Sequence, residues 1–147
     1  MTNTIDALGD LVTFGSLAAK TITEFRDDRI SFVPQYAFAY CVNLSYVNLP
    51  NASYVASSAF YSCTYLTEAW LDSCSSIGGS AFAATMLSRL YLNSTAVVSL
   101  ANSMFSMSKS TTFYVRPELV DAYSVARYWS NIKSQIKPFD FVNNVPL

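Results

Sequence analysis

The chain repeats itself at a nearly fixed interval. Phenylalanines recur at an almost constant step along it, at Phe38, Phe60, Phe82 and Phe105. Apolar residues five positions before them keep the same step, at Val33, Val55, Ile77 and Leu100. Repeats of roughly 20–29 residues with fixed apolar positions are typical of solenoids, in which each unit packs only on its neighbours. We therefore predict a solenoid of about four stacked repeats, each of roughly 22–23 residues.

Short segments within each repeat predict parallel β-strands. Residues 44–49, 66–71 and 87–92 are too short for helices and carry apolar residues at alternate positions near their ends. Strands stacked about 4.8 Å apart would turn one set of side chains inward: Val47, Leu49, Ala69, Leu71, Leu90 and Leu92. The phenylalanine column is expected to be the spine of the core, made of Phe38, Phe60, Phe82 and Phe105.

The two ends of the chain depart from the repeat. After residue 116, Pro117 and Glu118 suit the first turn of a helix. An apolar stripe at helical spacing would cover the last coil, and consists of Leu119, Val120, Tyr123, Ala126 and Trp129. Residues 21–25 predict a leading strand, and residues 1–20 either cap the solenoid or attach it to something else. The expected parts are an N-terminal segment (1–20), the solenoid (21–116), and a C-terminal capping helix with an extended tail (117–147).

The repeat resembles the BspA-type leucine-rich repeat family. The motifs that carry the resemblance are the cores YAFAYCVNL and SAFYSCTYL and the strands LSYVNLP and LTEAWLD, and it covers roughly residues 30–130. The ending YVRPELVDAYSVARYW is similar to the Tyr-Val-Pro and capping helix that close such arrays, although Val115-Arg116-Pro117 is one residue longer than the usual Val-Pro. The resemblance implies a leucine-rich-repeat solenoid that serves as an adhesion or interaction module. It also implies a likeness to short, unsecreted forms from bacteriophages.

The composition argues against nucleic acid and membrane partners. Hydrophobic residues make up 52% of the chain, charged residues 13%, and the formal net charge is −1. This balance provides no basic surface for nucleic acid. No stretch approaches the roughly 20 apolar residues of a membrane-spanning helix, and the start of the chain lacks the features of a signal peptide. The low number of charges on this apolar chain favours self-association, and we expect a homo-oligomer. A trimer is the preferred state, by analogy with virion fibres and decoration proteins.

The residue types also argue against an enzyme. The chain has no histidine, which is the commonest general base and the usual partner of a serine or cysteine nucleophile. Its carboxylates are dispersed except for Asp27 and Asp28, a pair more typical of a solvated turn than of a metal or glycosidase site. Cys41 and Cys63 share one repeat position and are predicted to be reduced core thiols rather than a disulfide. We therefore expect no catalytic residue, no metal and no cofactor.

The outward side of the strand ladder is the candidate binding face. Its members are Tyr46, Asn48, Glu68, Trp70, Asp72, Arg89, Tyr91, Tyr114 and Arg116. Tryptophan, tyrosine and arginine are enriched at interaction hot spots, yet aromatic residues also simply favour strands, and both interpretations stand. Glu68 and Arg89 are expected to pair across strands, which is worth about 0.5 kcal/mol. Replacing Trp70 by alanine should cost little stability but weaken binding, whereas the same change at Phe60 should cost about 3–5 kcal/mol.

Two functional hypotheses follow. The first is a virion-associated structural, decoration or fibre protein, in which residues 1–20 dock onto a capsid or tail protein and the repeats face a host-surface protein or glycan. The second is a bacterial cell-surface adhesion protein that binds a host protein or glycan. The aromatic stripe of the candidate binding face, made of Trp70, Tyr91 and Tyr114, is expected to be accessible, and it could serve either as an assembly interface or as the host-binding face.

Overall fold

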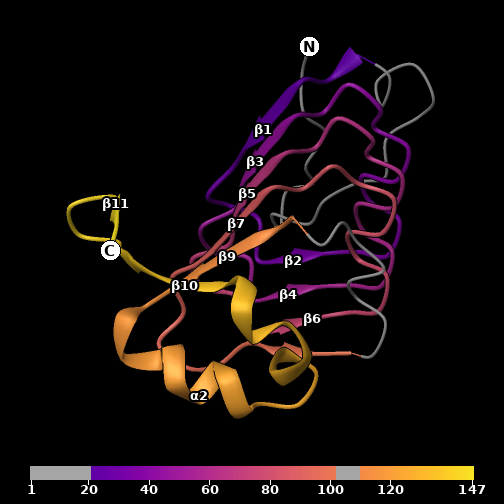
Figure 1. The fold of residues 1–147 in the computed structure, drawn as a ribbon. Coiled ribbons are helices and arrows are strands. Elements are labelled where there is room, and N and C mark those ends of the chain that lie inside the picture. The colour runs from indigo at the N-terminus through magenta and orange to yellow at the C-terminus, as the bar shows by residue number, and fades with distance from the viewer. Residues whose placement is uncertain (1–20, 102–109) are drawn as a thin grey trace.

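The computed structural model describes residues 21–101 and 110–147, and it is a solenoid of stacked coils (Figure 1). A seven-stranded sheet forms one side, in the order β1-β3-β5-β7-β9-β10-β11. Its strands are β1 (Glu24–Arg26), β3 (Tyr46–Asn48), β5 (Glu68–Trp70), β7 (Arg89–Leu92), β9 (Thr112–Val115), β10 (Ile136–Asp140) and β11 (Val145–Pro146). From β1 to β10 the pairing is parallel, as the sequence predicts, and only β11 runs antiparallel to its neighbour.

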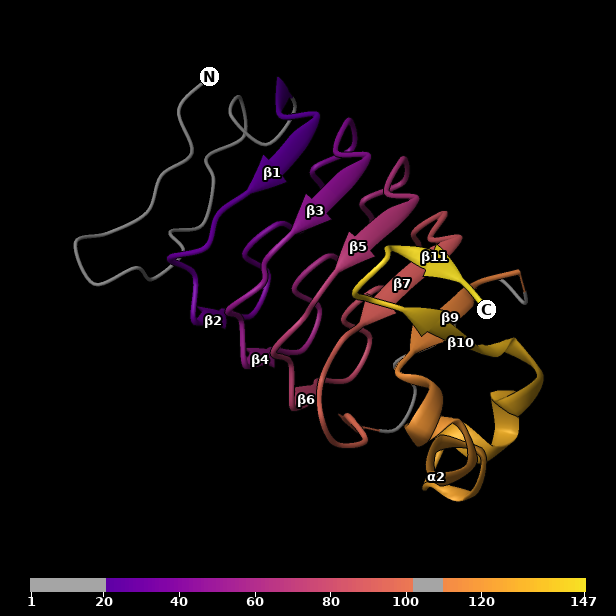
Figure 2. The ribbon, with the colours of Figure 1, turned by 90° about the vertical axis from the view of Figure 1, so that its left-hand side faces the viewer.

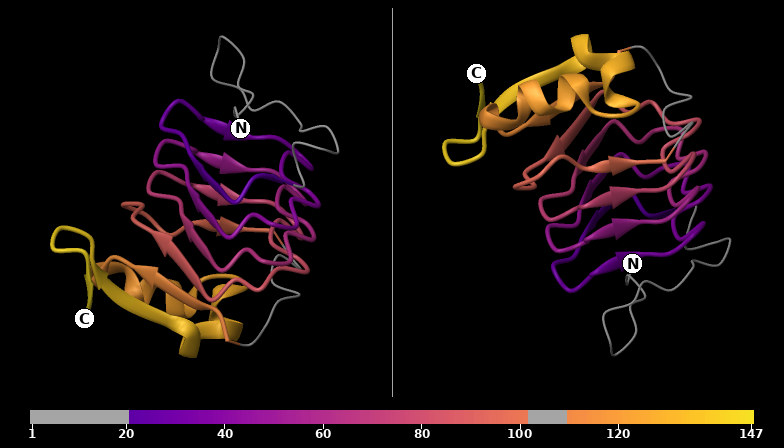
Figure 3. Two further views of the ribbon diagram at one scale, coloured as in Figure 1. Left: turned by 90° about the horizontal axis from the view of Figure 1, so that it is seen from above. Right: turned by 90° about the horizontal axis from the view of Figure 1, so that it is seen from below.

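A smaller sheet that the sequence did not reveal forms a second side of the solenoid, as the two views in Figure 3 show. Its four strands are paired in parallel and have two residues each: β2 (Phe32–Val33), β4 (Tyr54–Val55), β6 (Ser76–Ile77) and β8 (Ser99–Leu100). The turns that return from this sheet to the large one form a third side, where each coil again bonds to the next. The amide of Phe38 donates to the carbonyl of Ala59 at 2.8 Å, and that of Phe60 donates to Ala81 at 2.8 Å. The coils are therefore joined along three edges.

Hydroxyl groups reinforce this joining at two positions of the repeat. Thr67 and Ser88 each donate a hydroxyl hydrogen bond to the carbonyl of the equivalent residue one coil earlier, at 3.2 and 3.0 Å. Ser53 and Ser75 do the same next to the small sheet, at 3.1 and 2.9 Å. We call these two rows the hydroxyl ladders. Each hydroxyl bond lies beside a backbone hydrogen bond between the same two coils. These small polar residues therefore help to hold the coils together, besides giving the solenoid a polar surface.

The core confirms the predicted spine and the inward strand residues. The rings of Phe38, Phe60 and Phe82 are fully buried and stack with centroids 4.9 and 5.0 Å apart. Phe25 extends the stack, because its ring meets that of Phe38 edge-on at 4.9 Å; Phe105 lies outside the described residues. The six predicted inward residues have no exposed area. The three cysteines are buried and free, and the thiol of Cys63 donates to the carbonyl of Phe38 at 3.0 Å.

One glycine is required by the close approach of two coils. A Cβ atom at Gly78 would lie 2.5 Å from the amide nitrogen of Ser57 and 2.8 Å from the carbonyl carbon of Ala56, which are atoms of the preceding coil. Both distances are far inside van der Waals contact. Gly78 is therefore required by packing.

The C-terminal cap is helical, but in shorter pieces than the sequence predicts. A 3₁₀ turn (Pro117–Leu119) leads into α2 (Val120–Val125), and a second 3₁₀ segment (Trp129–Gln135) follows. The helix ends because Ala126 is extended and Tyr128 has a φ of 67°. The cap still covers the last coil: the indole of Trp129 donates to the carbonyl of Val98 at 2.7 Å, and the hydroxyl of Tyr123 accepts from the Val98 amide at 3.1 Å.

After the cap the chain returns to the large sheet. Residues 136–140 form β10, which pairs with β9 so that Ile136 lies beside Phe113 and Lys137 beside Tyr114. A turn then leads to β11, and the β10–β11 hairpin projects from the outward side of the sheet (Figure 1, Figure 2). The predicted extended tail is thus a further strand of the solenoid. In the part of the chain that the structure describes, no helix has the length and apolarity needed to span a membrane.

Candidate binding face

All nine residues of the candidate binding face lie on the outward side of the large sheet, on its strands or directly after them. We call this side the outer face. Strand pairing puts Asn48 beside Trp70, Trp70 beside Tyr91, and Tyr91 beside Tyr114. The predicted register is therefore confirmed. The alternate residues point inward because successive side chains of a strand lie on opposite faces.

Three aromatic side chains form one continuous stack across three strands. The ring of Trp70 lies 3.7 Å from that of Tyr91, and Tyr91 lies 4.9 Å from Tyr114, with interplanar angles of 7° and 15°. Stacked pairs of this kind contribute about 0.5–1.5 kcal/mol beyond the area that they bury. The stack therefore stabilises the fold, whether or not it also contacts a partner.

Glu68 joins the stack to the neighbouring column of side chains. One of its carboxylate oxygens accepts the indole N–H of Trp70 at 2.7 Å, and the other accepts two bonds from the Arg89 guanidinium at 2.6 and 3.0 Å. The predicted cross-strand pair of Glu68 and Arg89 is confirmed. These bonds hold the indole in a fixed orientation on the sheet.

The C-terminal strand covers one half of the outer face, and this corrects the prediction of a fully accessible stripe. Phe139 is 3% exposed, and its ring lies 5.0 Å from that of Tyr91 and 5.3 Å from that of Tyr114. Phe141 approaches the edge of Trp70 at 6.4 Å. As a result Tyr91 is only 7% exposed, while Trp70 and Tyr114 are half-buried. The half of the face over β7 and β9 is thus occupied by the chain's own tail.

The half over β1 and β3, which bears neither of these tail contacts, remains open, and we call it the open half. The guanidinium of Arg26 lies 4.0 Å above the ring of Tyr46 and donates to its hydroxyl at 3.0 Å. The amide nitrogen of Asn48 approaches the same hydroxyl at 3.4 Å. The amide oxygen of Asn48 is buried and accepts no hydrogen bond in the described part of the chain, which is uncommon because buried polar atoms are nearly always paired.

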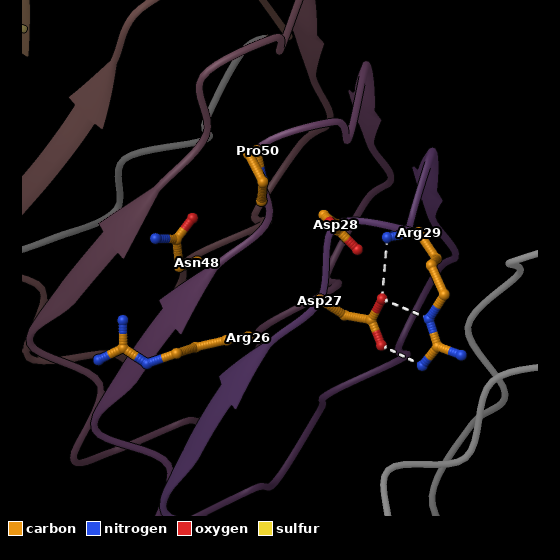
Figure 4. Close-up of a pocket in the computed structure, with 6 residues that line it drawn as sticks. All are labelled: Arg26, Asp27, Asp28, Arg29, Asn48 and Pro50. Carbon is orange, nitrogen blue, oxygen red and sulfur yellow. Dashed lines mark hydrogen bonds and ion pairs between the residues drawn. The ribbon is translucent and has the colours of Figure 1, made fainter.

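A hollow of about 420 Å³ lies at this end of the sheet. Figure 4 shows the six residues that line it: Arg26, Asp27, Asp28, Arg29, Asn48 and Pro50. Asp27 is held by Arg29, which donates to both of its carboxylate oxygens at 3.0 and 2.6 Å. This hydrogen-bonded pair lowers the pKa of the Asp27 carboxyl, so Asp27 stays ionised and forms part of the wall. Arg26 extends along the sheet away from that pair (Figure 4).

Sequence reasoning missed Arg26 and Arg29, although a signal for Arg26 exists. Arg26 lies one repeat step before Asn48 and pairs with it in the strand register, so it occupies the same column of the outer face one coil earlier. The leading strand was predicted over residues 21–25 and is found at Glu24–Arg26. Arg29 lies in the turn that follows it.

On one side of the aromatic stack lies a row of polar residues, Asp72, Asn93 and Arg116. Asp72 and Asn93 each have one buried side-chain oxygen that accepts no hydrogen bond in the described part of the chain. The guanidinium of Arg116 donates to the carbonyl of Asn93 at 2.8 Å. Burial raises the pKa of the Asp72 carboxyl, and the positive charge of Arg116 opposes the shift. The row borders two further hollows, of about 430 and 340 Å³.

The carboxylates and thiols of the described residues are the groups that could bind a metal or act as nucleophiles. Within 21–101 and 110–147, no group of three or more cysteine and carboxylate side chains gathers to hold a metal ion. Burial raises the pKa of the Cys74 thiol to about 11. The hydrogen bond with Cys41, together with burial, also raises the pKa of the Cys63 thiol. Thiols in this state are poor nucleophiles at neutral pH.

Comparison with known proteins identifies the repeat. The family model described as BspA type leucine rich repeat region matches residues 19–144 in six copies. No curated protein sequence matches the chain significantly. Among solved structures, the crystal structure of the pneumococcal vaccine antigen PcpA is similar, with 13% sequence identity and a TM-score of 0.40; the match covers 86% of this chain and 42% of that one. The chain therefore spans less than half the length of that structure.

Proposed function

Because the chain belongs to the BspA-type leucine-rich repeat family, whose members are typically binding scaffolds, we propose that it is a non-enzymatic binding module whose contact site is the open half of the outer face. One observation carries the proposal. The C-terminal strand covers the aromatic stack over β7 and β9, whereas Arg26, Tyr46 and Asn48 are left beside a hollow.

The open half offers both hydrogen-bond donors and acceptors to a protein or glycan partner. Arg26 keeps guanidinium N–H groups beyond the one that it donates to Tyr46. The hydroxyl of Tyr46 accepts bonds from Arg26 and Asn48, and its own proton is available to a partner. The oxygen of Asn48 would gain a hydrogen-bond donor if a ligand group reached it after a small rotation of the side chain. The part of the half-buried Trp70 ring that remains exposed supplies aromatic area beside these groups.

We further propose that the setting of this module is a virion, in which residues 1–20 dock the chain onto a capsid or tail protein. The low charge of the chain supports docking into a larger assembly, and the start of the family match at residue 19 supports a separate role for the residues before it. Deleting residues 1–20 should leave a folded solenoid that is no longer incorporated into particles. Unchanged incorporation, measured by mass spectrometry of purified particles, would contradict this setting.

The second setting is a bacterial cell surface, where the same open half would bind a host protein or glycan. The neighbouring genes distinguish the two. Capsid, portal or tail genes support the virion, and an upstream in-frame export signal supports the cell surface. The proposed contact site is the same in both cases.

The contact site is tested by binding of the labelled full chain to intact host cells, compared between matched variants. Arg26→Ala and Asn48→Ala should each weaken binding, by about 2 kcal/mol or roughly thirtyfold if the residue is a hot spot. Val125→Ala is the control, because Val125 is 80% exposed on the cap and far from the open half. Equal loss with the control, or no loss in either variant while the unfolding transition is unchanged, would reject the open half as the site.

A further inference from the structure

The turn side of the solenoid carries no charge over three coils. Between Arg29 and Arg89 the sequence has only two ionisable acids, Glu68 and Asp72, and no lysine or arginine. Both acids lie on the large sheet or directly after it. The side chains of residues 34–43, 56–65 and 78–86, which we call the turn face, are therefore entirely uncharged (Figure 1, to the right of the large sheet).

Large apolar and aromatic side chains stand out on this uncharged face. Tyr36, Tyr40, Tyr65 and Met86 are 51%, 60%, 65% and 65% exposed. The ring of Tyr61 meets that of Tyr40 edge-on at 5.7 Å, which links the tyrosines of two adjacent coils. Serine, threonine and asparagine occupy much of the remaining surface. Several large exposed aromatic and apolar side chains on one uncharged face are typical of an interaction surface.

Neither the core nor the backbone explains the tyrosines. Their rings contribute little to the buried core, because most of each side chain is exposed. Tyr36 and Tyr40 have φ values of 59° and 63°, a left-handed conformation that disfavours bulky residues. The later coils place Ser58 and Ser80 at the position of Tyr36, and Ser62 and Ala84 at the position of Tyr40, with similar φ values. The fold therefore accepts small residues at both sites, and apart from the contact of Tyr40 with Tyr61 the exposed rings are available to a partner.

We propose that the turn face binds the turn face of a second copy of this chain, so that the protein is a homodimer. This goes beyond the proposed function, because it does not use the outer face. Hydroxyl groups both donate and accept hydrogen bonds, and aromatic rings stack on one another, so a face made of them is complementary to itself. Since it has no charge, two identical copies meet without like-charge repulsion. A two-fold axis through the turn face leaves the open half of each copy free.

The test compares the full chain with a triple variant built from the chain's own repeat. Tyr36→Ser, Tyr40→Ser and Tyr65→Asn put in the residues found at the same positions of neighbouring coils, which the fold already accommodates. Sedimentation velocity at micromolar concentration should show twice the 16.2 kDa mass of the chain for the native protein, and the single mass for the variant. The native dimer should not weaken as salt is raised, because no ion pair crosses the interface.

Two controls make the result decisive. A matched variant that removes exposed apolar residues elsewhere, Val125→Ser with Val142→Ser, should remain dimeric. Unfolding of the triple variant by urea should follow a transition like that of the native chain, which separates loss of the interface from loss of the fold. A monomeric native chain, or an oligomer of any size that the triple variant leaves intact, would overturn the proposal. Failure here would not affect the open half, whose test uses other residues and another readout.

Discussion

Phe60 and Trp70 show how differently two aromatic residues of one coil contribute. Phe60 is fully buried between Phe38 and Phe82, at 4.9 and 5.0 Å. Phe60→Ala should therefore cost about 3–5 kcal/mol of unfolding free energy, because it opens a cavity in the spine. The sequence predicted almost no cost at Trp70. The structure changes that expectation to about 1–2 kcal/mol, because the indole stacks on Tyr91 and binds Glu68.

Urea denaturation of the two alanine variants measures this difference. Trp70→Phe is the matched control, since it retains an aromatic ring for stacking but removes the N–H donated to Glu68 and part of the ring area. Its stability should lie between those of the native chain and Trp70→Ala. Equal losses for Phe60→Ala and Trp70→Ala would contradict the assignment of one ring to the core and the other to a half-buried face.

Asp72 and Asp140 should respond to pH in opposite directions. Burial raises the pKa of Asp72 in the folded chain, so the folded state binds this proton more tightly than the unfolded one. Its ionisation then destabilises the fold as pH rises through the raised pKa, and the penalty is absent below the ordinary value of 3.8. Asp72→Asn should accordingly stabilise the protein at neutral pH and have no effect well below pH 3.8. Asn93 already exemplifies this exchange one coil later.

The ionisation of Asp140 should have the opposite effect on stability. Hydrogen bonds from the backbone and side chain of Asn143 lower its pKa, so its stabilising effect is present above the ordinary carboxyl pKa and is lost as pH falls through the lowered value. Asp140→Asn should therefore destabilise at neutral pH. Thermal unfolding of both variants between pH 2 and pH 7 checks the pair, and changes of the same sign at neutral pH would contradict the burial of Asp72.

At the scale of elements, the tail strand decides how much of the outer face is accessible. Phe139 and Phe141 bring β10 and the turn after it against Trp70, Tyr91 and Tyr114. Replacing both phenylalanines by alanine should expose Tyr91 and the edge of Trp70, which lowers stability by several kcal/mol and shifts tryptophan emission to longer wavelength. Trp129 is fully buried and should not contribute to the shift. The same double change in a Trp70→Phe background should leave the emission where it was; a shift there would place its origin in the cap.

The elements differ in how readily the sequence predicts them. Val47, Ala69 and Leu90 recur at the repeat step, so the parallel strands and their register follow from the pattern. The two-residue strands of the small sheet are too short to produce a periodic signal. Ile136 lies one repeat step after Phe113 and continues the inward column, yet the intervening cap hides this step. The packing of Phe139 on Tyr91 is a long-range contact that no local sequence pattern encodes. The sequence therefore predicted which residues form the candidate face, but not that the tail covers part of it.

At the scale of the molecule, each coil packs only on its neighbours, and this should appear in hydrogen exchange. Residues 52–73 have a described coil on both sides, with backbone bonds to each, such as those of Ala56 to Val33 and Phe60 to Ala81. Their amides should exchange slowest, with protection falling toward the hairpin, where residues 142–147 are exposed. Mass spectrometry of peptides after deuterium labelling measures the gradient. Protection highest in the hairpin, or uniform along the chain, would contradict a stack held by neighbour contacts.

The hydroxyl ladders should allow further coils to be added to the solenoid. Ser53 and Thr67 each bond one coil back, and the carbonyls of the same two residues receive Ser75 and Ser88. The coil of residues 52–73 thus offers the next coil the same carbonyl acceptors that it uses on the previous coil. Duplicating this unit in tandem should lengthen the solenoid by one coil, about 4.8 Å, and yield a folded protein no less stable than the original. Duplicating only residues 52–62 would insert half of a coil. The resulting protein should misfold, or unfold at a lower urea concentration.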